Sequence, residues 1–187
     1  RTLMRSLCRI APVYAVAGNW EPRAARSVRR IYAGTGVRVL DGAAVPLGSP
    51  DGGLWLVGSA DGDVDGLVAA LADVPDEAAT VVLYHRPDAI ERVARAGADV
   101  YLAGHTHGGQ VALPLYGAMV TLSRYGRRFA RGRHRVGDTT LLVSRGLGME
   151  GGLGHPFGHQ GGGEDGAAVE HVGGEHGAGF AVKQHLE

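Results

Sequence analysis

Residues 80–107 carry the stretch that decides the fold, TVVLYHRPDAIERVARAGADVYLAGHTH. The first apolar run, residues 80–84, has the length and β-branched composition of a buried strand. Residues 87–96 have helical spacing and begin with a proline, which the first turn of a helix tolerates. Residues 99–103 form a second apolar run. A strand, a helix and a strand in this order favour α/β layers around a central sheet.

Both predicted strands end at histidine. His85 follows the first strand, and His105 and His107 follow the second, between Gly104 and Gly108. Open parallel sheets place their sites at the carboxyl ends of the strands. The flanking glycines allow a sharp backbone turn, and imidazole is a ligand for Zn, Fe, Mn and Ni. The sequence therefore predicts a histidine cluster at one sheet edge, with ordinary polar loop residues as the alternative to metal binding.

Further segments extend this pattern in both directions. We expect helices in residues 1–11, before Gly34 and in 64–74, and strands at 13–17, 37–40, 54–57 and near 110–113, 118–122 and 139–144. The Asp51-Gly52-Gly53 turn predicts that the strands on either side of it, 37–40 and 54–57, form a small meander. Helices and strands alternate first and strands dominate later, which indicates an α/β fold with a central sheet.

Asn19 follows the predicted strand at residues 13–17 and is expected at the same sheet edge as the histidines. Its amide oxygen is a suitable hard ligand for a cation. The alternatives are a turn residue with positive φ and a helix cap, which are common uses of asparagine after glycine.

Composition limits the classes of function. The chain has 187 residues with 19 basic and 19 acidic side chains, so one domain of ordinary size is expected and a nucleic-acid partner has no support from net charge. Cys8 is the single cysteine, which excludes an internal disulfide. No apolar run approaches the ~18 residues of a transmembrane span.

Charge is distributed unevenly along the chain. Residues 1–149 hold 18 arginines and 13 acidic residues, a net of +5, whereas residues 150–187 hold one lysine and six acidic residues, a net of −5. The second part is rich in glycine and lacks an apolar period. We therefore expect one folded domain over residues 1–149 and a disordered tail over residues 150–187.

Three motifs together resemble the calcineurin-like metallophosphoesterase superfamily. The motifs are Gly18-Asn19, His85 within residues 83–88, and Gly-His-Thr-His-Gly-Gly-Gln at residues 104–110. They stand in the order of the third, fourth and fifth motifs of that family. The last motif, with residues 111–148, is similar to a branch of small bacterial phosphodiesterases.

The resemblance implies a four-layer αββα sandwich, which we expect to be incomplete at its amino-terminal edge. It also implies a hydrolase that cleaves phosphomonoester or phosphodiester bonds by a metal-bound hydroxide, with two divalent ions drawn from Mn, Fe, Zn or Ni. Matched motif by motif, Asn19, His85 and His105 would hold the second ion and His107 the first.

The sequence also departs from the family pattern around Asn19. The Asp-x-His and Gly-Asp-x-x-Asp motifs, which supply the remaining ligands, do not precede it, and Trp20 stands where the family has its catalytic histidine. Indole cannot replace that histidine, so no catalytic residue is assigned. We expect an incomplete two-metal site with at most one ion at high occupancy. Either the missing motifs lie upstream, or the chain is an inactive member or fragment that binds phosphorylated ligands or lipid headgroups.

A basic stretch follows the histidine motif. Arg124, Arg127 and Arg128 begin this stretch, and guanidinium groups match the geometry of phosphate. We expect them to bind a phosphorylated small molecule or a phospholipid, with peripheral contact to an anionic membrane; the alternative is a solvated hairpin with arginines on its wet face. A cytoplasmic location, or one on the cytoplasmic side of a membrane, fits this expectation.

Residues 61–66 contain three aspartates, Asp61, Asp63 and Asp65. The run begins like a calcium loop, but that pattern requires a glutamate where this chain has Ala72. We expect a solvated acidic turn.

Overall fold

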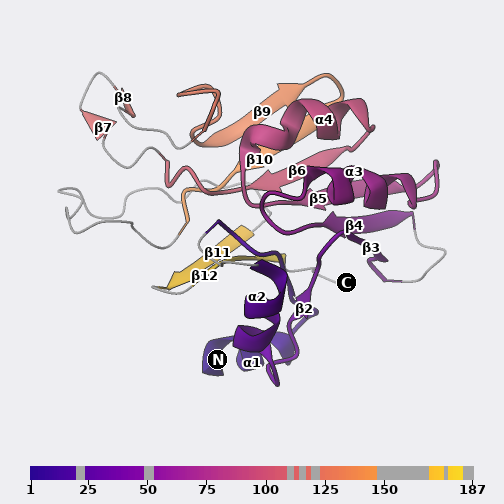
Figure 1. The fold of residues 1–187 in the computed structure, drawn as a ribbon, viewed down its shortest axis with the longest axis vertical. Coiled ribbons are helices and arrows are strands. Elements are labelled where there is room, and N and C mark those ends of the chain that lie inside the picture. Colours follow the sequence, from indigo (N-terminus) through magenta and orange to yellow (C-terminus); the bar gives the residue numbers. More distant parts are fainter. Residues whose placement is uncertain are drawn as a thin grey trace.

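The computed structural model describes residues 1–19, 24–48, 53–108, 112–113, 117–118, 123–146, 169–174 and 177–182. A six-stranded sheet dominates this part of the chain (Figure 1). In spatial order its strands are β3 (Ala43–Pro46), β4 (Leu54–Gly58), β5 (Ala79–Leu83), β6 (Val100–Ala103), β10 (Thr139–Val143) and β9 (Gly132–Val136).

The four inner strands of this large sheet run parallel. β4 pairs with β5, β5 with β6, and β6 with β10 in parallel, while the edge strands β3 and β9 are antiparallel to their neighbours. The strand, helix and strand predicted for residues 80–103 are confirmed, and the parallel pairing of β5 with β6 makes them a βαβ unit. Because parallel strands end at the same edge of a sheet, the loops after β4, β5 and β6 meet there.

Helices cover one face of the large sheet. α3 (Val64–Ala72), the short 3-10 helix η1 (Pro87–Ala89) and α4 (Ile90–Arg95) lie over it in Figure 1. Alternate strand residues point to this face, where Val82 and Leu141 pack with Leu67 and Ile90, all fully buried. The alternation follows from the two-residue side-chain period of a strand.

A second, small sheet packs on the other face. It consists of β1 (Tyr14–Ala15) and β2 (Arg38–Val39), which pair in parallel. Val16 and Leu40 from this side pack against Leu56 and Leu83 of the large sheet. The two sheets approach closely at Gly58, where a Cβ would lie 2.9 Å from Cγ1 of Val16.

Two helices complete the layers. α2 (Ala24–Tyr32) packs Val28 against Ala17 beyond β1, and α1 (Thr2–Cys8) lies at the same end of the molecule (Figure 1). The order helix, sheet, sheet, helix confirms the predicted α/β class and is consistent with a metallophosphoesterase sandwich.

One predicted strand pairing is wrong, and two strands were not predicted. β2 does not form a meander with β4, because β3, which the sequence analysis missed, is the antiparallel partner of β4. β9 was also missed, since its sequence, Gly-Arg-His-Arg-Val, has little apolar character; as an edge strand it needs only one paired side. Two further strands, β7 (Ala112–Leu113) and β8 (Gly117–Ala118), pair with each other.

Within the predicted tail, β11 (Val169–Gly174) and β12 (Gly177–Val182) form an antiparallel hairpin, and the rest of residues 150–187 lies outside the described part. Among the described residues, no helix has the length and hydropathy needed to cross a bilayer.

Candidate metal centre

Three polar atoms converge at the seam between the two sheets. Nε2 of His85 lies 2.7 Å from Oδ1 of Asn19, and Nδ1 of His105 lies 3.2 Å from the same oxygen. The two imidazole nitrogens lie 3.1 Å apart. The structure therefore brings the side chains of Asn19, His85 and His105 together at one sheet edge, where the sequence predicted them.

Each donor occupies the loop that follows a strand. Asn19 comes four residues after β1, His85 two residues after β5, and His105 two residues after β6. Pro87, two residues after His85, begins η1, a position that tolerates its missing backbone N–H. The ends of β5 and β6 are joined by a 2.9 Å hydrogen bond from the Gly104 N–H to the His85 carbonyl.

The histidine loop has an unusual backbone. His105 and His107 adopt φ of +68° and +49°, a region that non-glycine residues seldom occupy. Such conformations cost about 1–3 kcal/mol each and concentrate at functional sites. Thr106, between them, is 1% exposed and its hydroxyl donates to the Ala130 carbonyl at 2.6 Å. That bond helps to hold the turn in this conformation.

Close packing fixes the imidazole of His85. The ring is 3% exposed, and a Cβ on Gly18 would come within 3.1 Å of its Cε1 atom. The His105 ring, 5% exposed, meets it edge to face, with centroids 4.8 Å apart. Glycine before Asn19 therefore gives the histidine ring room to approach, a reason that the sequence alone does not reveal.

The spacing of the three atoms suits ligands of one cation. Two ligand atoms about 2.1 Å from an ion and at right angles to each other lie about 3 Å apart. The three observed distances between the donor atoms, 2.7, 3.1 and 3.2 Å, are close to that value. One amide oxygen and two imidazole nitrogens form a donor set for Mn, Fe, Zn or Ni. The residues present therefore fit one divalent ion.

The other predicted ligand, His107, is half-buried on the same loop as His105. Within the described residues, no group of three or more His, Cys, Asp or Glu side chains is arranged to hold a metal. His107 consequently does not form a three-histidine group with His85 and His105. Trp20, predicted at the position of the catalytic histidine, lies outside the described residues.

The predicted substrate arginines are exposed on residues 123–131. The guanidinium of Arg124 lies 4.8 Å from the centroid of the Tyr125 ring and also donates to its hydroxyl, which raises the pKa of Arg124. Arg128 lies 5.0 Å from the Phe129 ring centroid. Arg127 lies between them in the sequence. The structure thus places these arginines on one exposed segment.

This segment is fastened to the histidine loops at two points. Asp88, three residues after His85, accepts hydrogen bonds from the Ser123 hydroxyl at 2.6 Å and from the Arg124 N–H at 3.1 Å. The Thr106 hydroxyl holds the carbonyl of Ala130. Neither contact is predictable from the sequence, because each joins residues far apart in the chain.

The prediction of a solvated acidic turn over residues 61–66 is wrong for Asp61. Its side chain is only 5% exposed and pairs with Arg86, with 2.9 Å between Oδ2 and Nε. Burial raises the pKa of Asp61, while the nearby Arg86 and His105 charges oppose that rise. Asp65 does fit the prediction, with a side chain that is 90% exposed. The three aspartates are equivalent in the sequence and only packing distinguishes Asp61.

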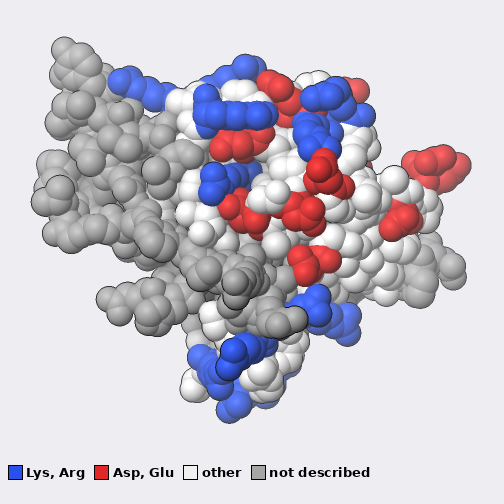
Figure 2. Space-filling view, viewed as in Figure 1, with Lys and Arg blue, Asp and Glu red and all other residues white. Residues whose placement is uncertain are grey.

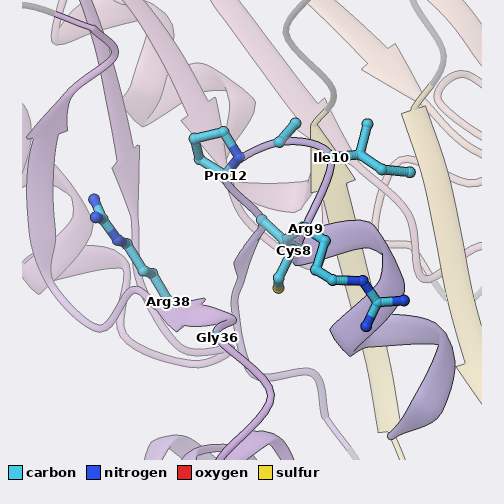
Figure 3. Close-up of a pocket in the computed structure, with 8 residues that line it drawn as sticks. Cys8, Arg9, Ile10, Pro12, Gly36 and Arg38 are labelled. Carbon is cyan, nitrogen blue, oxygen red and sulfur yellow. The ribbon is translucent and has the colours of Figure 1, made fainter.

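A pocket of about 380 Å³ lies away from the converging atoms (Figure 3). It is bounded by the residues before β1 and β2, among them Pro12 and Gly36, whereas Asn19 follows the opposite end of β1. The side chains of Arg9 and Arg38 point in different directions in Figure 3. In Figure 2 the basic side chains, all arginines among the described residues, gather around α1 and α2, whereas over α3 and α4 they are mixed with acidic side chains.

Comparisons with known proteins point to one superfamily. The chain is 38% identical to the uncharacterized metallophosphoesterase YkuE of Bacillus subtilis over 87 residues, which are 46% of this chain and 29% of that protein. It is 29% identical to the phosphodiesterase YaeI of Escherichia coli over 158 residues, 81% of this chain and 57% of that protein. No family model and no solved structure matches. The chain thus spans less than two thirds of either relative, and both similarities support the metallophosphoesterase superfamily.

Proposed function

We propose that this chain carries part of the active centre of a metal-dependent phosphoesterase, in which Asn19, His85 and His105 bind one divalent cation. The observation that carries the proposal is the convergence of Oδ1, Nε2 and Nδ1 within 2.7–3.2 Å of one another. The names of the two relatives, a metallophosphoesterase and a phosphodiesterase, add support.

A cation at this position would supply Lewis-acid chemistry by neutralising charge on phosphoryl oxygens and by activating water. The protein's own contribution is orientation. Asn19, His85 and His105 would hold the cation through one amide oxygen and two imidazole nitrogens. His85 and His105 are almost fully buried, so little solvent reaches their imidazole rings.

His107 is the proposed ligand of the other ion, the first ion of the family's pair, while Asn19, His85 and His105 hold the second. His107 follows His105 by two residues and belongs to the Gly-His-Thr-His-Gly-Gly-Gln motif, which we assign to the small bacterial phosphodiesterase branch. Manganese and a dinuclear centre are part of this proposal. With Asn19, His85 and His105 used by one ion, His107 would be the sole ligand from these motifs for the other. We therefore propose that the ion held by Asn19, His85 and His105 binds more tightly.

Arg124, Arg127 and Arg128 form the proposed substrate contact. Their segment is attached through Asp88 and Thr106 to the loops that carry the histidines. Guanidinium groups bind phosphate oxygens with paired N–H donors, so a phosphorylated small molecule or phospholipid is the proposed substrate class.

A second candidate function is binding without turnover. It is favoured by the donor set, because an amide and two imidazoles include no carboxylate to bridge two ions, and by Trp20 at the position of the family's catalytic histidine. In that case the chain would hold a cation and a phosphorylated ligand or lipid headgroup, but would not cleave it.

Metal titration tests the shared part of both functions. The 187-residue chain should bind one Mn²⁺ or Co²⁺ by calorimetry, and His85→Ala and His105→Ala should each abolish that binding. His134→Ala is a matched control, because His134 lies on β9 and its Nε2 contacts the Arg131 carbonyl. Equal loss in all three variants, or no binding by the wild type, would refute the metal site.

Assays on the loaded chain then separate the two functions. Hydrolysis of bis(4-nitrophenyl) phosphate or 4-nitrophenyl phosphate that disappears in His105→Ala would establish the enzyme. Binding of inorganic phosphate with no hydrolysis of either compound would establish the binding protein.

A further inference from the structure

The buried carboxylate of Asp61 is unusual among the charged groups near the metal centre. Its side chain is 5% exposed, while its partner Arg86 is 39% exposed. Oδ2 accepts a hydrogen bond from Arg86, and Oδ1 is buried with no hydrogen-bond partner among the described residues. Desolvation offsets most of the attraction in such pairs, so stability alone is a weak reason for their presence.

Asp61 and Arg86 also make backbone hydrogen bonds to segments that lead to the proposed ligands. The Asp61 N–H donates to the Ala17 carbonyl at 2.9 Å, and Ala17 precedes Gly18 and Asn19. Arg86 directly follows His85. Its carbonyl accepts a hydrogen bond from the hydroxyl of Tyr101, on the strand that leads to His105. The pair therefore links the small sheet to two strands of the large one.

The loop that carries Asp61 is itself firmly held. Asp63 caps α3 by accepting from the Gly66 N–H at 3.0 Å, and it also accepts from the Ser59 hydroxyl at 2.7 Å. The Gly62 N–H donates to the hydroxyl of Tyr84 at 2.8 Å. Residues on both sides of Asp61 are thus anchored, so its carboxylate offers a fixed point for Arg86 and for the Asn19 loop.

We propose that Asp61 is a positioning residue of the metal centre. Its contacts with Arg86 and Ala17 hold the Asn19 loop of the small sheet against the His85 and His105 loops of the large sheet, so that the three donor atoms meet. Asp61 is not itself a ligand in this arrangement. The inference rests on the proposed role of Asn19, His85 and His105 as a cation site.

Titration of the full chain with Co²⁺, followed by visible absorption, tests the proposal. Asp61→Asn and Arg86→Gln should each lower Co²⁺ affinity by about 10–100-fold, the usual effect of losing an outer partner of a metal site, and should shift the absorption bands. The double variant should recover part of the affinity, because a glutamine N–H can donate to the asparagine oxygen where Arg86 donated to Asp61.

A matched control separates positioning from general loss of an ion pair. Asp65 pairs with Arg92 at 2.6 Å, but its side chain is 90% exposed and lies in α3. Asp65→Asn should leave Co²⁺ affinity and spectrum unchanged. Equal effects of Asp61→Asn and Asp65→Asn, or a double variant no better than the single ones, would overturn the proposal.

A metal-free readout distinguishes this inference from the proposed function. The imidazole nitrogen resonances of His85 and His105 should move in Asp61→Asn and not in Asp65→Asn, whether or not Co²⁺ binds. Failure of the wild type to bind Co²⁺ would refute the cation site alone. Unchanged resonances together with wild-type affinity in Asp61→Asn would refute the positioning role alone.

Discussion

Oδ1 of Asn19 lies 2.7 Å from Nε2 of His85, although 66 residues separate them and they come from different sheets. The contact is possible because Gly18 leaves room for the imidazole. The proposed cation site can therefore form only when the two sheets are packed together. Ligand binding and the packing of the two sheets should consequently be coupled.

That coupling predicts stabilisation by metal. A cation that binds only the folded chain at 100 times its Kd should raise the free energy of unfolding by about 2.7 kcal/mol. Thermal unfolding of the chain with and without Mn²⁺ measures the effect, and EDTA should reverse it. The His105→Ala variant should show no increase; an increase of the same size there would place the ion elsewhere.

Replacing Gly18 should damage the same contact. A Cβ at this position would lie 3.1–3.3 Å from three atoms of the His85 ring, closer than ordinary van der Waals contact. Gly18→Ala should cost about 1–3 kcal/mol in unfolding free energy and also weaken Mn²⁺ binding. Gly53→Ala is the control, since a Cβ there meets no atom within 4 Å. Wild-type Mn²⁺ affinity in Gly18→Ala would show that the ring position does not matter.

Asp88→Ala should weaken the binding of phosphate more than the binding of metal. The carboxylate of Asp88 holds the Ser123 hydroxyl and the Arg124 N–H, and its loss would release one attachment of the arginine segment. We expect weaker binding of inorganic phosphate by about tenfold, the effect of losing one or two hydrogen bonds, with unchanged Mn²⁺ affinity. Asp138→Ala, in an exposed pair with Arg135, should change neither. Loss of Mn²⁺ affinity in Asp88→Ala would contradict this division of roles.

The raised pKa of Asp61 predicts a pH dependence of stability. As pH rises past the ordinary carboxyl value of 3.8, the unfolded chain loses the Asp61 proton before the folded chain does, because burial raises the folded pKa. Its contribution should therefore make the chain less stable from pH 3.8 up to the folded pKa, and constant above it. The unfolding free energy, measured by urea titration at several pH values in this range, should fall less steeply with pH for Asp61→Asn than for the wild type. In Asp65→Asn the unfolding free energy should depend on pH as it does in the wild type. The same pH dependence in the wild type and in both variants would disprove the effect.

The sequence by itself determined the strand, helix and strand within residues 80–103 and the residues at the strand ends. Strand and helix periods and the proline at position 87 are local features, so His85, His105 and Asn19 could be placed at the end of their strands from neighbouring residues alone. The family motifs added the metal as an expectation, and the structure brings three of those ligands together.

Only the tertiary structure decided how these pieces meet. It paired β3 rather than β2 with β4, and it buried Asp61 while leaving Asp65 in solvent. It also set the arginine segment against the histidine loops through Asp88 and Thr106. The physical reason is that side-chain pattern reports which face of an element is apolar, whereas sheet order and buried polar contacts depend on residues that are distant in the chain.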